Sequence, residues 1–190
     1  MSQQEINLSA MPTPNPNTIK FLPSLQFFES GTLDIPSKEE AHKSVLAQAL
    51  FEIESIEGVM IGFNFISVTK SDNANWEGLI ELIRDAIKAV LAKHGSDVVD
   101  EKYLEEIVSF EADNKEVAEK IKVVIDTEIR PAVAMDGGDI LFKSFKEGIV
   151  TLQLQGACSS CPASTMTLKM GVENRLKEEF PEVVEVLQEI

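Results

Sequence analysis

The sequence is poor in basic residues and in histidine. It holds 17 Lys plus Arg against 32 Asp plus Glu, a net charge of −15, and its only histidines are His42 and His94. Phosphates and anionic lipids repel so acidic a chain, so we expect no nucleic-acid partner and no membrane partner. We interpret the acidity first as a source of solubility.

Long apolar runs and targeting signals are also lacking. No run approaches the roughly 18 residues that cross a bilayer. The opening stretch, MSQQEINLSAMPTPNPN, has neither the basic start and apolar segment of a secretory signal nor the Arg-rich, acid-poor composition of a mitochondrial transit peptide. We therefore expect a cytoplasmic protein, most simply a bacterial one.

No catalytic constellation can be assembled from the sequence. It offers no nucleophile with a nearby histidine and acid, and no glycine-rich phosphate loop. We expect a protein that is not an enzyme. Its 44% of hydrophobic residues are enough to bury real cores, and its length allows one large domain or two small ones.

The first half predicts a small domain of strands and helices over residues 1–97. Ser37 opens the capping box SKEE, behind which apolar residues recur at helical spacing for about four turns. A second amphipathic helix is predicted over 75–93 and ends at Gly95. The domain begins with a loop, PTPNPN, because its prolines exclude a helix there. The expected strands are 18–22, 24–29, 58–62 and 64–70, the last two forming a hairpin.

An acidic segment, residues 98–114, separates this domain from the next and is interpreted as a solvated linker, with a helical turn around 103–108. Residues 115–190 then predict a helix capped by Asn114 and stopped by Pro131. Two strands, a helix from Pro162 and a last strand follow, at 139–146, 148–155, 162–180 and 182–188. The expected fold class is α+β, with two small domains that each pack a β-sheet against helices. The C-terminal order is α-β-β-α-β.

Both cysteines of the chain lie in one segment, GACSSCPAS, at Cys158 and Cys161. The segment joins a predicted strand to a helix that begins at Pro162. Free N–H groups and a partial positive charge at a helix start favour thiolates, so we expect both sulfurs close to solvent and easily ionised. The spacing leaves three uses open: a thioredoxin-class dithiol oxidoreductase, a structural zinc site and an iron–sulfur cluster.

The number of cysteines restricts the two metal uses. Structural zinc and a [4Fe–4S] cluster each take four protein ligands, whereas one chain supplies two cysteines here and no histidine nearby. Either metal use therefore implies that two chains share the site across a symmetric interface. A cluster held by two thiolates from each side suits a carrier better than an electron conduit.

The segment MDGGD, residues 135–139, has two carboxylates around two glycines. We interpret the glycines as residues with unusual backbone angles between helix and hairpin, and Asp136 and Asp139 as carboxylates that cap or solvate the turn.

These segments resemble a known family. MDGGD, GACSSCPAS and TMTLKMGVENRL are similar to the C-terminal domain of NifU and of the Nfu iron–sulfur carrier proteins. TPNPNTIKFLP, FNFISVTK and the helix that contains Trp76 resemble the domain that precedes it in two-domain Nfu proteins. The resemblance covers residues 11–97 and 115–190.

The resemblance implies a homodimer that binds one labile [4Fe–4S] cluster between its subunits and transfers it to apo-proteins. Cys158 and Cys161 would be the cluster ligands. Upstream cluster donors and apo iron–sulfur clients would be the partners, and the N-terminal domain, which has no cysteine, would dock partners.

Overall fold

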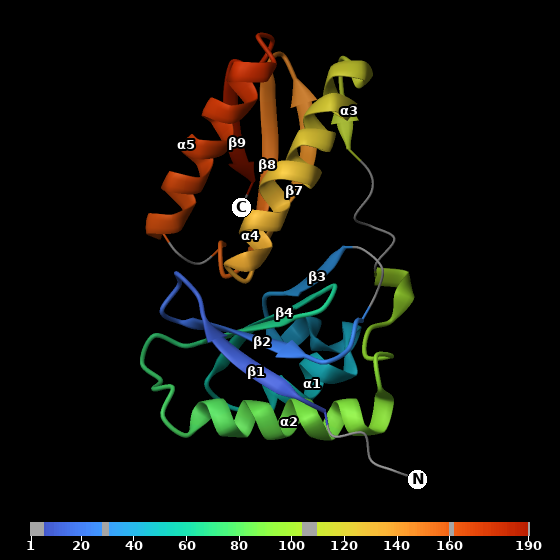
Figure 1. Ribbon diagram of the computed structural model, residues 1–190, viewed down its shortest axis with the longest axis vertical. Coiled ribbons are helices and arrows are strands. Elements are labelled where there is room, and N and C mark those ends of the chain that lie inside the picture. The colour runs from blue at the N-terminus through green and yellow to red at the C-terminus, as the bar shows by residue number, and fades with distance from the viewer. Residues whose placement is uncertain (1–5, 28–30, 104–109, 160–161, 190) are drawn as a thin grey trace. The chain divides into compact units, whose positions relative to one another are not determined.

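The computed structural model describes residues 6–27, 31–103, 110–159 and 162–189. The chain forms two compact units, Met1–Glu106 and Ile107–Ile190 (Figure 1). Each unit has its own apolar core. Each unit packs helices against a β-sheet, which confirms the predicted α+β class.

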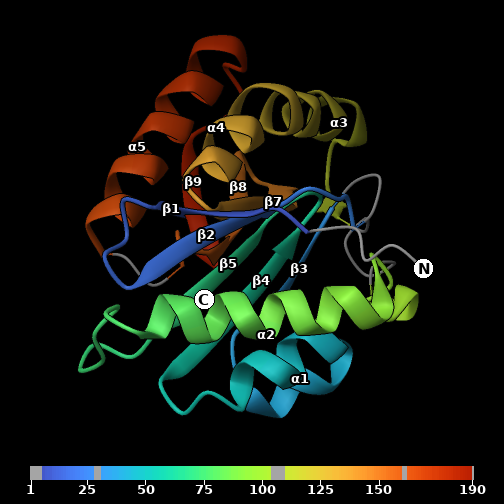
Figure 2. The same cartoon turned by 60° about the horizontal axis from the view of Figure 1, so that its bottom comes forward.

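The first unit is built on a five-stranded antiparallel sheet in the order β1-β2-β5-β4-β3. Alternate residues of the strands, such as Phe21 in β2 and Ile66 in β5, share one core with Ile83 and Ile87 of helix α2. Helix α2 lies across one face of the sheet (Figure 2). The elements are β1 (Leu8–Pro12), β2 (Thr18–Pro23), β3 (Thr32–Ile35), the 3-10 helix η1 (Lys38–Lys43), α1 (Val45–Phe51), β4 (Ile56–Gly62), β5 (Ile66–Lys70), α2 (Leu79–His94) and the 3-10 helix η2 (Glu101–Tyr103).

Two outer strands of this sheet were not predicted. They are β1, which pairs with β2, and β3, which pairs with β4. The predicted strand over 24–29 is wrong in its described part, since residues 24–27 belong to no strand. β1 ends at Pro12, and a proline is tolerated there because an edge strand loses no ladder hydrogen bond on its open side.

The predicted capping box at Ser37 is also wrong. Ser37 makes no side-chain cap and is followed by the 3-10 helix η1. Helix α1 begins at Val45, and its N-cap is Ser44, whose Oγ accepts hydrogen bonds from the N–H groups of Leu46 and Ala47. The same hydroxyl donates to the carbonyl of Val98 at 2.6 Å, so it serves two segments at once. The end of α2 at Gly95, with a φ of 63°, is as predicted.

The acidic segment 98–114 is structured at both ends. Val98 is buried in the core of the first unit, and Phe110 packs against the core of the second. Of the predicted helical turn at 103–108, residues 104–109 lie outside the described residues.

The second unit has a four-stranded mixed sheet in the order β6-β7-β8-β9. β7 and β8 are antiparallel, whereas β8 and β9 are parallel and are connected through α5. The order α3-β7-β8-α5-β9 confirms the prediction for this part of the chain. The elements are β6 (Glu111–Ala112), α3 (Lys115–Val124), the π-helical segment η4 (Ile125–Ile129), α4 (Arg130–Met135), β7 (Gly138–Lys146), β8 (Ile149–Gly156), α5 (Pro162–Glu179) and β9 (Glu185–Glu189).

The first helix of this unit continues past Pro131, contrary to the prediction. Proline lacks an N–H and its ring clashes with the carbonyl four residues earlier in a regular α-helix. The π-helical segment η4 precedes it, and the N–H of Arg130 bonds to the carbonyl of Ile125, five residues back. After this wider turn the chain enters α4 with Pro131 in its first turn, where a proline is tolerated.

Candidate functional site

The segment GACSSCPAS joins the end of β8 to the start of α5. β8 ends at Gly156, which has a φ of 60°. A turn follows, in which the N–H of Ser159 donates to the carbonyl of Gly156 at 3.2 Å and its Oγ donates to the same oxygen at 2.9 Å. α5 begins at Pro162, as predicted. Cys161 lies outside the described residues, so its predicted role as a ligand stays a prediction.

Cys158 lies in this turn with its side chain directed inward. It is 5% exposed and belongs to the apolar core of the second unit. The sequence predicted a sulfur close to solvent, and for Cys158 that prediction is wrong. A protonated thiol behaves as a small apolar group, so it packs in the core at little cost.

The two glycines of MDGGD serve different purposes. Gly137 follows the C-terminus of α4 and has a φ of 78°, which is the left-handed conformation that favours glycine. Gly138 has no such φ and begins β7, where it pairs with Gly156 across the hairpin. A Cβ atom at position 138 would lie 2.4 Å from the Sγ atom of Cys158. Gly138 is therefore needed for space, not for backbone conformation.

The turn and the hairpin are linked by backbone hydrogen bonds. The N–H of Ala157 donates to the carbonyl of Gly137 at 3.2 Å. This bond places the residue before Cys158 directly against the glycine turn. The conformation of MDGGD therefore helps to fix where the Cys158 backbone lies.

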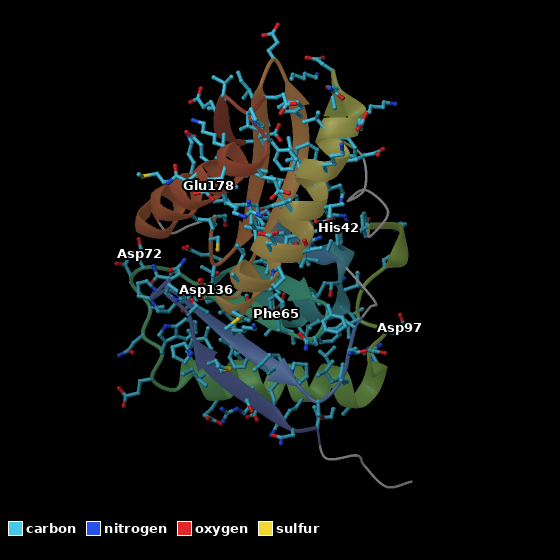
Figure 3. All side chains as sticks on the ribbon, turned by 45° about the horizontal axis from the view of Figure 1, so that its top comes forward. His42, Phe65, Asp72, Asp97, Asp136 and Glu178 are labelled. Atoms are coloured by element: carbon cyan, nitrogen blue, oxygen red, sulfur yellow. The ribbon has the colours of Figure 1, made fainter. Side chains whose placement is uncertain are left out.

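The two carboxylates of MDGGD differ as well. Asp136 is exposed and closes α4 with its backbone N–H, as a turn residue is expected to do (Figure 3). Asp139 is 2% exposed, and its carboxylate accepts two hydrogen bonds from Arg130, at 2.9 and 2.7 Å. The hydrogen bonds to Asp139 raise the pKa of the Arg130 guanidinium above its ordinary value, so the arginine stays charged. Asp139 forms a buried ion pair and does not solvate the turn.

Sequence reasoning missed Gly138 and Arg130 as residues that shape this site. The doublet Gly137-Gly138 is visible in the sequence, but only the structure shows that Gly138 is the one that lies against the Sγ atom of Cys158. For Arg130 a signal was present: it follows Asp126 by four residues on one helical turn, and its Nη1 donates to that carboxylate at 3.2 Å.

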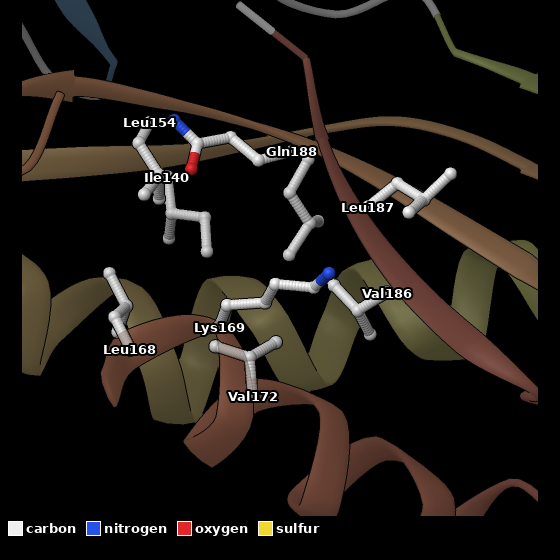
Figure 4. A pocket seen from close by; sticks show the side chains of 9 residues that line it. Ile140, Leu154, Leu168, Lys169, Val172, Val186, Leu187 and Gln188 are labelled. Carbon is white, nitrogen blue, oxygen red and sulfur yellow. The ribbon is translucent and has the colours of Figure 1, made fainter. Parts of the chain in front are cut away.

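A separate small pocket with a cavity volume of about 10 Å³, partly open to solvent, lies between α5 and the sheet (Figure 4). None of its lining residues is a cysteine, histidine, aspartate or glutamate, so the pocket has no side chain suited to iron or zinc. Within the described ranges, no group of three or more such side chains could hold a metal ion. The lining residues are Ile140, Leu152, Leu154, Leu168, Lys169, Val172, Val186, Leu187 and Gln188.

No helix in the described part of the chain has the length and apolar character required to cross a membrane.

Two protein-family models match the chain. The model described as "Scaffold protein Nfu/NifU N terminal" matches residues 8–94, and the model described as "NifU-like domain" matches residues 121–187. One match falls in each compact unit.

Curated relatives match over nearly all of the chain. The human protein "NFU1 iron-sulfur cluster scaffold homolog, mitochondrial" is 44% identical over 177 residues, which are 93% of this chain and 69% of that protein. The Drosophila grimshawi protein of the same name is 42% identical over 177 residues, which are 93% of this chain and 59% of that protein. The chain spans between 59% and 65% of the length of four such Drosophila relatives. These relatives are named as mitochondrial proteins, so the expectation that this chain is a bacterial cytoplasmic protein stays a prediction.

Among solved structures, the chain resembles the NMR structure of a NifU-like protein from Saccharomyces cerevisiae, with 31% identity and a TM-score of 0.48. The match covers 53% of this chain and 90% of that chain.

Proposed function

The chain belongs to the Nfu/NifU family of iron–sulfur cluster scaffold proteins, and on that premise we propose that it carries a labile [4Fe–4S] cluster and transfers it to apo-proteins. Two chains share the cluster in a homodimer, and Cys158 and Cys161 of each chain are its ligands. The protein is a carrier and not an enzyme, as are the scaffold proteins of this family.

The observation that carries the proposal is the number of cysteines. A [4Fe–4S] cluster usually takes four thiolates, and the chain has two, both in GACSSCPAS. Neither unit offers a substitute set of ligands among the described residues. A symmetric pair of chains supplies four thiolates from one segment, so cluster binding and dimer formation are coupled.

The position of the turn that contains Cys158 supports the role of this residue as an exchangeable cluster ligand. The segment lies between the end of β8 and the start of α5, outside the hydrogen-bond ladder of the sheet. Transfer proceeds by ligand exchange: a client thiol loses its proton and bonds to iron, and the released carrier thiolate takes up a proton. No electron moves in this step, so the cluster keeps its oxidation state and needs no co-reactant.

The first unit has a separate role in this proposal. It contains no cysteine and has a core of its own, so the cluster site does not depend on its side chains as ligands. We assign residues 1–97 to docking of clients or upstream donors, residues 98–114 to the acidic connection, and residues 115–190 to cluster binding. A chain lacking residues 1–97 should still form the cluster and should deliver it more slowly to a given client. Unchanged delivery would remove the docking role.

The decisive experiment is anaerobic reconstitution with iron and sulfide, with Mössbauer spectra and molecular mass measured on the same sample. The proposal predicts a brown dimer with about four iron atoms per two chains.

Cys158→Ser and Cys161→Ser should each abolish stable cluster binding, whereas the neighbouring exposed Ser159→Ala should retain it. A variant at either cysteine that keeps full iron and sulfide would refute the ligand assignment. A colourless monomer that cycles between dithiol and disulfide would support the oxidoreductase instead, and about half a zinc per chain would support the zinc dimer.

A further inference from the structure

Because Gly138 has no side chain, it leaves space for the Sγ atom of Cys158. A Cβ built on Gly138 would lie 2.4 Å from the Sγ atom of Cys158, 3.0 Å from its Cβ, and 3.0 Å from the carbonyl oxygen of Gln155. Real Cβ atoms essentially never approach another heavy atom as closely as 2.4 Å. The closest of these contacts involves the sulfur, so any side chain at position 138 has to displace it.

Cys158 occupies this space from a backbone that is fixed on both sides. On one side the N–H of Ala157 bonds to Gly137, and on the other Ser159 bonds twice to Gly156. The sulfur can nevertheless move without breaking any of these bonds, because rotation about the Cα–Cβ bond of Cys158 changes only the direction of the side chain. Rotation about this bond can therefore turn the thiol while the turn keeps its backbone hydrogen bonds.

The inward position does not suit a shared cluster. The interior of the second unit is close-packed, and Cys158 lies there with apolar residues such as Ile140 and Leu154 in one cluster. A four-iron cluster held between two chains has to meet the sulfur at the surface of each. A sulfur that bonds to such a cluster must point away from Gly138.

We propose that Gly138 is a positioning residue for Cys158: it forms a seat, the space between Gly138 and the turn 156–159, in which the thiol rests when no cluster is bound. Cluster loading draws the sulfur out of the seat by rotation about the Cα–Cβ bond. The seat itself follows from the geometry, and only the loading step rests on the function proposed above. A seated thiol is shielded from oxidants and from thiol reagents, because their attack requires access to sulfur.

The seat is tested by the rate at which iodoacetamide labels Cys158 in the cluster-free full chain. The parent is Cys161→Ser, so that only one thiol reacts, and each rate is divided by that of the same variant unfolded in urea. Gly138→Ala should raise the labelling rate about tenfold or more, because labelling of a seated thiol must wait for transient opening. Gly171→Ala is the matched control: it lies in α5 with nothing within 4 Å of its added Cβ, and its rate should equal that of the parent. Equal rates in all three proteins would overturn the seat.

A second variant background distinguishes a general folding defect of Gly138→Ala from displacement of the Cys158 sulfur. In Cys158→Ala the sulfur is absent, so the closest contact of the new Cβ is removed, and the two next closest are at 3.0 Å. Gly138→Ala should lower the unfolding temperature clearly in the parent and much less in Cys158→Ala. Equal losses in both backgrounds would show that Gly138 serves the backbone alone and would overturn the proposal.

The loading step is tested with both cysteines present. Gly138→Ala should take up as much iron and sulfide per dimer as the wild-type chain and at least as fast, because the loaded form does not use the seat. A folded Gly138→Ala chain with a reactive Cys158 and no cluster would overturn the loading step. If the wild-type chain binds no cluster at all, the proposed function fails while the labelling result still decides whether the seat exists.

Discussion

Arg130 holds the buried carboxylate of Asp139 through two parallel hydrogen bonds, from Nε at 2.9 Å and from Nη2 at 2.7 Å. One oxygen of Asp139 also accepts the N–H of Ile140 at 2.8 Å, so the buried charge accepts hydrogen bonds from both a side chain and the backbone. The pair connects the first residue of α4 to the second residue of β7, on either side of the glycine turn. It therefore fixes the segment that forms the Gly138 seat.

Removing the arginine should destabilise the second unit more than removing an exposed ion pair. In Arg130→Leu the carboxylate of Asp139 stays buried without its charged partner, and we expect a loss of about 3 kcal/mol in the free energy of unfolding. Lys120→Leu breaks the exposed pair with Glu116 and should change the stability of the second unit little. The only Trp and Tyr, Trp76 and Tyr103, lie in the first unit, so hydrogen exchange of β7–β8 peptides is the appropriate measurement. Equal protection in the two variants would contradict the argument.

The hairpin turn between β7 and β8 predicts that two substitutions change the stability of the hairpin in opposite directions. Glu147 and Gly148 have φ values of 52° and 78°, the conformation of a primed turn. Glu147→Asn should stabilise the hairpin by about 0.5–1 kcal/mol, because asparagine tolerates positive φ better than glutamate. Gly148→Ala should destabilise it by about 1–3 kcal/mol, since the new Cβ is strained and meets the carbonyl of Glu182 at 2.8 Å. Urea unfolding followed by far-UV circular dichroism measures both, and a shift of the same sign in the two variants would contradict the assignment of the turn.

Local signals in the sequence predicted much of the fold. The hairpin follows from Glu147-Gly148 and alternation, the start of α5 from Pro162, and the end of α2 from Gly95, because each depends on residues adjacent in the chain. The fold class and the strand and helix order of the second unit follow from these elements. The Nfu/NifU family was predicted from short segments in both halves and is confirmed by the family matches.

The features that were missed depend on residues far apart in sequence. Ser44, not Ser37, caps α1 because its hydroxyl also reaches Val98, 54 residues away. β1 and β3 form strands because they pair with β2 and β4 at the two sides of the sheet. Likewise, the burial of Cys158 depends on the glycine at position 138, which lies 20 residues earlier and is opposite only because β7 and β8 pair. No local pattern could have predicted these three contacts.

Glu173 predicts how the stability of the second unit changes in acid. Its carboxylate accepts a hydrogen bond from Lys177 and another from the N–H of Val186 in β9, and these bonds lower its pKa in the folded protein. A lowered pKa means that the stabilisation is fully present above the ordinary pKa of a glutamate and is lost as the pH falls through the folded value. Glu173→Gln should therefore be less stable than the wild type near neutral pH, and the difference should shrink as the pH falls below the ordinary pKa of a glutamate.

The measurement is the urea midpoint by circular dichroism across this pH range, with the fluorescence of Trp76 recorded to separate the unfolding of the first unit. Glu178→Gln, an exposed carboxylate of the same helix, is the control and should show a smaller difference at neutral pH (Figure 3). A difference between Glu173→Gln and the wild type that grows in acid would have the wrong sign for this account.

The two serines near the start of α1 offer a direct comparison. The Ser44 hydroxyl is buried, accepts two backbone N–H groups and donates to Val98, whereas Ser37 makes no side-chain cap. Ser44→Ala should lower the free energy of unfolding of the first unit by about 1–2 kcal/mol, since it removes the cap and leaves a buried carbonyl with one donor fewer. Ser37→Ala should change it by less than about 0.5 kcal/mol. Trp76 fluorescence during urea unfolding reports on this unit, because its indole N–H bonds to the carbonyl of Pro16 at 2.9 Å within the same unit. A larger loss in Ser37→Ala than in Ser44→Ala would restore the capping box that the sequence predicted.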